Sequence, residues 1–245
     1  MSEVTYESRA GVAIITFSRP EANNSLNQGA ADQLHAAWKR FAASDEDRVA
    51  VLTGGEKNFC TGADTRDMPE NVLMCMPNLA VECNKPIIAA VSGWVVGAGA
   101  SMAMMADMVV AGSDAKFMYP EAKVGAFAGL MGGFPTRMPI KVGMQWTMTG
   151  DPMTAQRAYE IGLVNEVTEP GQQFDRALEL ANKIAANAPL VVRALKTLAF
   201  QTLQRGPVEQ NFANSLMLQG IRNSGDYVEG LAAHAEKRKP AFKAE

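Results

Sequence analysis

Histidine and cysteine are scarce in this chain of 245 residues. It has two histidines, His35 and His234, and three cysteines, Cys60, Cys75 and Cys83. An odd number of cysteines without the spacing of metal ligands fits a reduced chain better than a disulfide scaffold. Cys60 has no histidine near it in the sequence, which argues against a thiol nucleophile. We therefore expect neither a disulfide framework nor a metal site.

The features of nucleic-acid-binding and membrane proteins are missing too. The 23 Lys and Arg residues against 26 Asp and Glu residues give a formal net charge of −3, which offers no general attraction for nucleic acids or anionic membranes. No apolar run approaches the length of a membrane span, and the N-terminal MSEVTYESRAG does not follow the pattern of a secretory signal. We expect a cytoplasmic protein with no nucleic-acid or membrane partner.

Strands and helices alternate through the first two-thirds of the chain. Short β-branched apolar runs predict the strands, and apolar residues at helical spacing predict the helices. This alternation argues for an α/β layered core. The expected strands are Val12–Phe17, Val49–Thr53, Ile87–Val91 and Met108–Ala111, and the expected helices are Gln28–Ala43 and Ala100–Met108.

From about Thr154 the pattern is almost wholly helical, which predicts a helical C-terminal region that begins near residue 190. Thr154 is expected to cap the first of these helices, and Ser224 precedes the last. The helices expected between them are Asp175–Asn187, Leu190–Arg205 and Val208–Asn223. Apolar faces on the helices after Pro189 predict an interface between subunits.

Two glycine-containing turns each follow an apolar strand. Gly62 lies in KNFCTGAD, where Asp64 is expected to cap a helix, and Gly97-Ala98-Gly99 precedes the Ala- and Met-rich helix. Glycine lets the backbone approach closely, and the start of a helix leaves N–H groups unpaired. Such a turn can hold a developing negative charge on oxygen. The segment GAGASM lacks the third glycine of a dinucleotide fingerprint, so a nucleotide-binding turn is not indicated.

A single carboxylate follows the second turn in the sequence. Tyr119-Pro120-Glu121 places Glu121 directly after a proline, which restricts the backbone before it. An isolated glutamate of this kind is most often a solvated turn residue. Together with a turn that can stabilise an oxyanion, it predicts a site for enolate chemistry.

Taken together, SRPEANNSLN, KNFCTGAD, KPIIAAVSGWVVGAGASMAMMADMVVAGSDAKFMYPE, TGDPMTAQRAYEIGLVNEV and EGLAAHAEKRKPAFK closely resemble the crotonase superfamily of enoyl-CoA hydratases and isomerases. The resemblance covers nearly the whole chain in order. It implies an α/β fold in which a repeated ββα superhelix, residues 1–190, is followed by a C-terminal helical trimerisation region, residues 191–245. It also implies an acyl-CoA substrate and a homotrimer or dimer of trimers.

The resemblance implies functional residues as well. The backbone N–H groups of Ala63 and Ala98 would form an oxyanion hole for the thioester carbonyl. Glu121 would be the acid/base, and Ser101 would position water or substrate. No metal or redox cofactor is implied, because coenzyme A is part of the substrate. The residues implied to bind substrate are Ala63, Asp64, Thr65, Arg66 and Ala98, and those implied to bind the CoA moiety are Asn24, Leu26, Phe242 and Lys243.

Ser101 is the main departure from the best-known hydratases, which have a glutamate at this position and another after the later proline. A hydroxyl can orient water but cannot accept a proton as a carboxylate does at neutral pH. Hydration or dehydration with Glu121 alone is the leading prediction, and Δ3,Δ2-enoyl-CoA isomerisation is the alternative. An aryl-propenoyl-CoA hydratase/lyase and a non-catalytic binder of acyl-CoA or RNA remain open. The segment from Asp64 to Lys85 is short, so the acyl group cannot be transferred from relatives.

Overall fold

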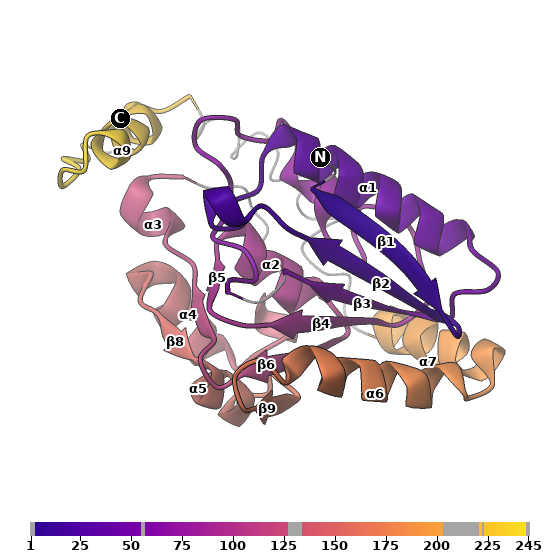
Figure 1. Ribbon diagram of the computed structural model, residues 1–245. Helices are drawn as coiled ribbons and strands as arrows, with labels where there is room; N and C mark the ends of the chain where they lie inside the picture. Colours follow the sequence, from indigo (N-terminus) through magenta and orange to yellow (C-terminus); the bar gives the residue numbers. More distant parts are fainter. Residues whose placement is uncertain (1–2, 55–56, 127–133, 203–220, 222, 244–245) are drawn as a thin grey trace.

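The main sheet has six strands and provides the central layer of the protein. The computed structural model describes residues 3–54, 57–126, 134–202, 221 and 223–243 (Figure 1). The strand order is β1-β2-β3-β4-β6-β9, with β1 antiparallel to β2 and all other neighbours parallel. The strands are β1 (Val4–Arg9), β2 (Val12–Phe17), β3 (Val49–Thr53), β4 (Ile87–Val91), β6 (Met108–Gly112) and β9 (Glu166–Thr168).

Helices cover both faces of this sheet. Helix α1 (Gln28–Ala43) contacts β1 and β2 on one face, and α6 (Gln173–Ala185) lies along β2, β3, β4 and β6 on the other (Figure 1). Every residue of β3 and β4 is buried, as expected for parallel strands covered on both sides. The strands and α1 coincide with the sequence prediction, apart from one extra residue in β6 and the edge strands β1 and β9, which were not predicted.

A second, smaller sheet of three strands lies at the end of the main sheet where its parallel strands finish. It consists of β5 (Trp94–Val96), β7 (Lys116–Met118) and β8 (Met153–Thr154), with β5 parallel to β7 and β7 antiparallel to β8. Helix α2 (Ala98–Met105) follows β5 directly, and the four-residue helix α3 (Glu121–Val124) follows β7 after a short turn. The order of these elements brings the starts of two helices to one small sheet.

Helix α2 is buried along its whole length and is held at both ends. All eight of its residues are buried. Beyond its C-terminal end, the Asp107 carboxylate accepts hydrogen bonds from the Ile87 N–H at 2.7 Å and from Lys196 Nζ at 2.7 Å. This anchor explains why the helix ends at Met105 rather than at the predicted Met108: Met108 already pairs with Ile88 in the main sheet. The helix also begins earlier than predicted, at Ala98.

The remaining helices lie around the two sheets. They are η1 (Pro20–Ala22), η2 (Val72–Cys75), α4 (Ile140–Thr149), α5 (Ala155–Glu160), α7 (Pro189–Thr202) and α9 (Gly225–Ala235). The predicted caps are confirmed, because Thr154 accepts from the Arg157 N–H and Ser224 accepts from the Tyr227 N–H. The predicted helix Val208–Asn223 lies almost entirely outside the described residues. Helix α9 lies beside α3, at the end of the molecule away from α7 (Figure 1).

One face of α7 is apolar and exposed. Leu190, Val191, Leu195 and Leu198 have exposed fractions of 77%, 57%, 63% and 58%. The helix is joined to the core by the buried ammonium group of Lys196, which donates to Asp107, to Asn78 and to the Lys85 carbonyl. The core therefore holds α7 in place and leaves this apolar face uncovered.

Candidate active site

The two glycine turns predicted from the sequence lie side by side. Cys60 forms an isolated parallel bridge with Val95, in which the Val96 N–H donates to the Cys60 carbonyl at 2.8 Å. Across the other edge of β5, the Gly97 N–H donates to the Met118 carbonyl at 2.9 Å. Strand β5 thus lies between the segment that leads to Gly62 and the segment that leads to Glu121. The small sheet positions the candidate site.

Gly97 is the point where the turns and the carboxylate meet. Its φ of +52° lies in the left-handed region, and a Cβ there would be 2.9 Å from Glu121 Oε1 and 3.7 Å from the Cα of Gly62. Gly62 also has a positive φ, +99°. Only glycine fits between these groups without strain. The second turn, the first turn and Glu121 are therefore within a few ångströms of one another.

Within the described part of the chain, the backbone N–H groups of Ala63 and Ala98 are unpaired. Leu26 and Ala63 form an isolated parallel β-bridge. In it, the Leu26 N–H donates to the Gly62 carbonyl and the Asp64 N–H donates to the Leu26 carbonyl. The N–H of Ala63 therefore points away from Leu26. Ala98 is the first residue of α2, where an N–H has no partner within the helix. Neither N–H has an acceptor among the residues that the structure describes. Two such donors suit an oxyanion.

Glu121 is a half-buried residue whose carboxylate has an inaccessible oxygen and, among the described residues, no charged partner. Its Oε2 is inaccessible and has no hydrogen-bond partner among the described residues. Burial raises the pKa of Glu121 from 4.5 to about 8, against a smaller lowering by its own backbone N–H. The nearby Lys123 is engaged with Asp151 at 2.8 Å. A carboxyl group with this pKa can both donate and accept a proton near neutral pH.

Ser101 is fully buried one turn into α2. Its hydroxyl donates to the Gly97 carbonyl at 3.1 Å, a bond that serine often makes within helices. The hydroxyl hydrogen is therefore occupied, while the oxygen keeps its capacity to accept. Tyr119 is a second buried hydroxyl on the Glu121 segment, and the sequence analysis did not single it out. It is 3% exposed, its ring centroid is 6.3 Å from that of Trp146, and its hydroxyl has no partner in the described part of the chain.

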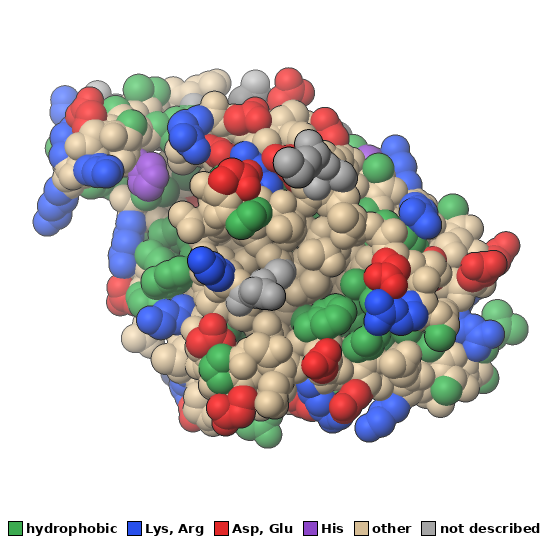
Figure 2. All heavy atoms as spheres, viewed as in Figure 1, with side chains coloured by type: hydrophobic (Ala, Val, Ile, Leu, Met, Phe, Trp, Pro, Cys, Tyr) green, Lys and Arg blue, Asp and Glu red, His purple; other side chains and the backbone are tan. Residues whose placement is uncertain are grey.

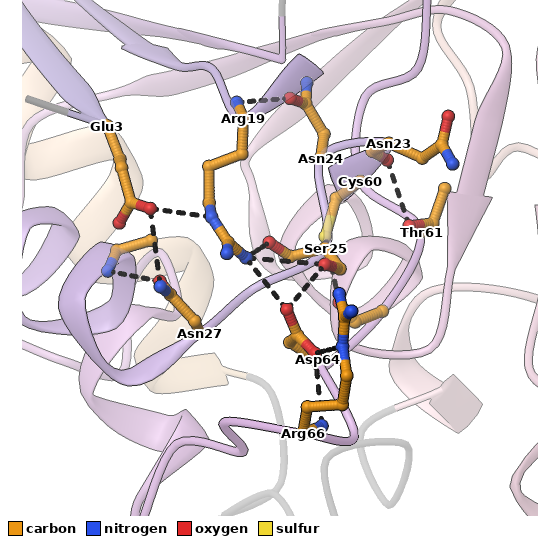
Figure 3. Close-up of polar contacts among 12 residues, drawn as sticks. Glu3, Arg19, Asn23, Asn24, Ser25, Asn27, Cys60, Thr61, Asp64 and Arg66 are labelled. Carbon is orange, nitrogen blue, oxygen red and sulfur yellow. Dashed lines mark hydrogen bonds and ion pairs between the residues drawn. The ribbon is translucent and has the colours of Figure 1, made fainter. Parts of the chain in front are cut away.

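Asp64 has a different role from the predicted helix cap. No helix follows it; its carboxylate instead lies 3.3 Å from Arg19 Nη1, 3.3 Å from the Ser25 hydroxyl and 3.1 Å from the Arg66 N–H (Figure 3). Burial raises its pKa, but these hydrogen bonds together bring the pKa below its usual value. The prediction was wrong because Arg19 and Ser25, distant in sequence, compete for the carboxylate. Asp64 fixes the turn after Ala63.

Asn24 and Leu26 are buried behind the first turn. The Asn24 amide donates to the carbonyls of Gly54 and of Asn58 and accepts from the Arg19 N–H at 2.6 Å (Figure 3). Leu26 is fully buried, and its backbone N–H and carbonyl are both used in the bridge to Ala63. These contacts shape the turn. By contrast, Thr65 and Arg66 are exposed, and the Arg66 side chain is 84% accessible.

Phe242 and Lys243, the predicted CoA contacts at the other end of the chain, lie against α3 and α9. A Cβ on Gly125 would be 3.0 Å from the Phe242 ring, and the Lys243 N–H donates to Asp226 at 2.7 Å. The Lys243 side chain is exposed, and Figure 2 shows Lys and Arg side chains gathered over this end of the molecule. Exposed members of this group in the tail after α9 are Lys237, Arg238, Lys239 and Lys243.

The described residues offer no metal site and no membrane-spanning helix. Within the described ranges, no group of three or more His, Cys, Asp or Glu side chains could hold a metal ion. None of the helices in those ranges combines the length and apolar character that a membrane span needs. Cys60 is fully buried, and burial raises its pKa to about 12, so it does not present a thiolate.

Comparison with known proteins shows the family and the fold of the chain. The sequence profile of the enoyl-CoA hydratase/isomerase family matches residues 7–245. The chain is 40% identical to (E)-benzylidenesuccinyl-CoA hydratase of Thauera aromatica, covering 98% of each chain. It is 34% identical to 2,3-dehydroadipyl-CoA hydratase of Escherichia coli, covering 99% of each. The crystal structure of carnitinyl-CoA hydratase from Mycobacterium avium superposes with a TM-score of 0.91 at 34% identity over the full length of both chains.

The chain belongs to the enoyl-CoA hydratase/isomerase family, within the crotonase superfamily, and is an enzyme of that family. The resemblance identified from the sequence motifs is thereby confirmed. The fold is the crotonase fold of the solved hydratases. The two glycine turns, the two free N–H donors of Ala63 and Ala98 in the described structure, and the half-buried Glu121 are the features of this chain from which its chemistry can be argued.

Proposed function

We propose that the protein hydrates a 2-enoyl-CoA thioester, or dehydrates the corresponding 3-hydroxyacyl-CoA, with Glu121 as its single acid/base. The observation on which this rests is the close contact at Gly97, the residue before Ala98. A Cβ added to Gly97 would lie 2.9 Å from Glu121 Oε1. The proton-transferring group and the candidate oxyanion donor thus lie at one backbone turn. The names of the relatives given above, which are hydratases of CoA thioesters, support the same reaction.

In this proposal the thioester carbonyl accepts hydrogen bonds from the N–H groups of Ala63 and Ala98. Glu121 takes a proton from water while the water oxygen bonds to the β-carbon and the electron pair of the double bond moves to the thioester as an enolate. The two N–H groups stabilise the enolate oxygen. Glu121 then transfers the proton to the α-carbon, which restores the carbonyl and the ionised glutamate. The thioester itself acidifies the α-carbon, so this chemistry calls for no metal or redox cofactor.

Ser101 would assist by position. Its hydrogen is donated to Gly97, so its oxygen would accept a hydrogen bond from the attacking water. Asp64, Thr65 and Arg66 would line the path of the CoA moiety, with the Asp64 ion pairs keeping the turn in shape. Asn24 and Leu26 would contribute by supporting that turn. At the C-terminal end, Lys243 would offer a positive charge to the CoA moiety and Phe242 an apolar contact.

Double-bond isomerisation is the second candidate, because one observation favours it. Moving a double bond from C3 to C2 needs a single group that removes a proton at C2 and returns it at C4. Ser101 occupies the position at which the best-known hydratases have their second glutamate, so Glu121 has no second carboxylate to assist it. Glu121, with a pKa raised to about 8, suits such a shuttle.

We also propose that the exposed apolar face of α7 is covered by other copies of the chain, as a homotrimer or a dimer of trimers. Leu190, Leu195 and Leu198 would be unusually exposed in a monomer, and an uncovered apolar stripe of this kind marks an interface. Multi-angle light scattering at micromolar concentration tests the assembly. A stable monomer would contradict it.

Incubation in isotopically labelled water tests the reaction. The purified protein is offered crotonyl-CoA, 3-enoyl-CoA and the CoA thioesters that its relatives' names specify, in H₂¹⁸O and separately in D₂O. Hydration adds the mass of one ¹⁸O-labelled water; isomerisation leaves the ¹⁸O content unchanged. Glu121→Gln is the matched control, because it keeps the size of the side chain and removes the base. If no CoA thioester is converted, the proposed function is wrong.

A further inference from the structure

The C-terminal helix α9 is in direct backbone contact with α3, the short helix that begins with Glu121. A Cβ on Gly230 of α9 would overlap the Val124 carbonyl oxygen and lie 2.5 Å from its carbon. A Cβ on Gly125, which ends α3, would lie 2.6 Å from the Asp226 carbonyl oxygen at the start of α9. Two glycines, one on each element, therefore allow a contact that no other residue would permit.

The chain after α9 folds back and adds a second contact to the same place. Glu229 of α9 accepts from Arg238 at 2.6 and 2.8 Å and from the Ala241 N–H at 2.9 Å. Hydrogen bonds from Arg238 and from the Ala241 N–H lower the pKa of Glu229 to about 2. The Glu229–Arg238 ion pair therefore stays charged at neutral pH. The returning tail places Phe242 against Gly125.

One turn before Gly230, on the same face of α9, Tyr227 reaches the segment that follows the first glycine turn. The Tyr227 hydroxyl donates to the Met68 sulfur at 3.7 Å. Met68 lies four residues after Asp64 in the exposed stretch that follows Ala63. Helix α9 thus contacts both the helix that contains Glu121 and the segment next to the proposed CoA path.

Helix α3 cannot hold Glu121 in place by itself. It has four residues, and its N-cap, Pro120, offers no side-chain hydrogen bond. A single helical turn is far too short to be stable without packing. The contacts of Gly230, Gly125 and Phe242 provide that packing on the side towards α9. A small displacement of α3 would move Glu121 relative to Gly97.

We infer that α9 and its returning tail form a C-terminal clamp, residues 225–243, that fixes Glu121 against the Gly97 turn, and that Gly230 is a positioning residue of this clamp. The inference rests on the proposed function for the role of Glu121, but its geometry does not depend on the identity of the acyl group. The contacts of Gly230, Gly125 and Phe242 involve α3, so we expect their loss to affect proton transfer by Glu121 more than the N–H groups of Ala63 and Ala98, which lie on other elements.

Gly230→Ala tests the clamp, because it favours helix formation in α9 but disturbs the contact between α9 and α3. Alanine favours the helix itself over glycine, so α9 should remain helical, while the added methyl group collides with the Val124 carbonyl. We expect kcat to fall about 10²-fold, the loss typical of a catalytic group misplaced by about 1 Å, with little change in KM for the acyl-CoA. Val228→Ala, an exposed position on the same helix, is the matched control and should retain the wild-type kcat.

The pH profile gives a readout that a purely structural defect would not produce. If α3 moves, Glu121 becomes hydrated and its pKa falls towards its ordinary value, so the acidic limb of the kcat profile should shift to lower pH in Gly230→Ala. Phe242→Ala removes the second contact without a collision, so it also tests the clamp if Gly230→Ala does not fold. It should show a smaller fall in kcat and a smaller shift of the acidic limb in the same direction, and a change in its KM would report the proposed CoA contact of Phe242. An unchanged kcat in folded Gly230→Ala, or a loss in KM alone, would overturn the inference.

The clamp can be tested even if no thioester is converted. The pH dependence of unfolding differs between the wild type and Glu121→Gln as long as Glu121 is buried. We expect this difference to shrink in the Gly230→Ala background and to persist in the Val228→Ala background. An undiminished difference in folded Gly230→Ala would overturn the clamp, whereas inactivity of the wild type overturns only the proposed function.

Discussion

At high pH, a variant in which Glu121 is replaced by an uncharged residue should be more stable than the wild type, because the wild type must then keep an ionised carboxylate in a partly buried position. Folding raises its pKa from 4.5 to about 8, so the folded state holds this proton more tightly than the unfolded chain. The resulting contribution to stability is fully present below pH 4.5 and is lost as the pH rises through 8. Each unit of difference between the pKa values in the folded and unfolded states changes the free energy of unfolding by about 1.4 kcal/mol when the group is fully shielded from water. Since Glu121 is only partly buried as a whole residue, we expect a total on the order of 2–4 kcal/mol between pH 5 and 8.

Glu121→Gln removes the titration and keeps the shape. Urea unfolding of both proteins, at one fixed protein concentration and at several values from pH 5 to 9, gives the difference in free energy of unfolding. Other titrating groups cancel in that difference, and a constant offset from the new amide does not affect its slope. The variant should gain stability over the wild type as the pH rises.

The same substitution should lower turnover about 10²–10⁴-fold, because it removes the proposed acid/base, while acyl-CoA binding persists. Activity and stability would then change in opposite directions at neutral pH. A difference in unfolding free energy that stays flat from pH 5 to 9 would show that Glu121 is hydrated in the folded protein, and the reasoning from its burial would be refuted.

Three other changes test the remaining parts of the site. Ala98→Pro deletes one oxyanion donor and should cost about 10²–10³ in kcat, while Ala98→Gly retains activity; full activity of a folded Ala98→Pro protein would assign the role to another group. Ser101→Ala removes a hydrogen bond worth about 1 kcal/mol to the attacking water, so hydration should fall about fivefold; an isomerase would be unaffected, which a 3-enoyl-CoA assay would reveal. Leu195→Lys combined with Leu198→Lys places charges on the exposed face of α7 and should lower the molar mass measured by light scattering; an unchanged mass would place the interface elsewhere.

The sequence predicted the elements that depend on local pattern. The buried strands β2, β3 and β4 and helix α1 coincide with the predicted ranges, because uninterrupted apolar runs and helical spacing are local properties. Strand β7 was missed because Lys116–Met118 is only three residues long and forms a strand only by pairing with β5. The predicted helix cap at Asp64 failed for a related reason, since Arg19 is close to it only in the folded chain.

The sequence pointed to the residues of the candidate site but not to their burial or their contacts. Motif spacing singled out Gly97, Ala98 and Glu121, and the fold brings them together at one turn. The raised pKa of Glu121 could not be predicted, because it depends on burial and not on neighbouring letters. The close contact between Gly230 and Val124 is likewise invisible in the sequence, where Gly230 reads as a weak point in a helix.

Helix α2 has a consequence for how this enzyme can diversify. Its eight residues are all buried, Gly97 at its start is hydrogen-bonded to Met118, and Asp107 beyond its end is bonded to Ile87 and Lys196. A change on this helix must be accommodated by the core, so selection can rarely use it to alter the acyl group that is accepted. The stretch from Thr65 to Glu70 is mostly exposed and has no such restriction. Substitutions in that stretch can therefore accumulate without disturbing the core, while the backbone N–H of Ala98 at the start of α2 stays in place.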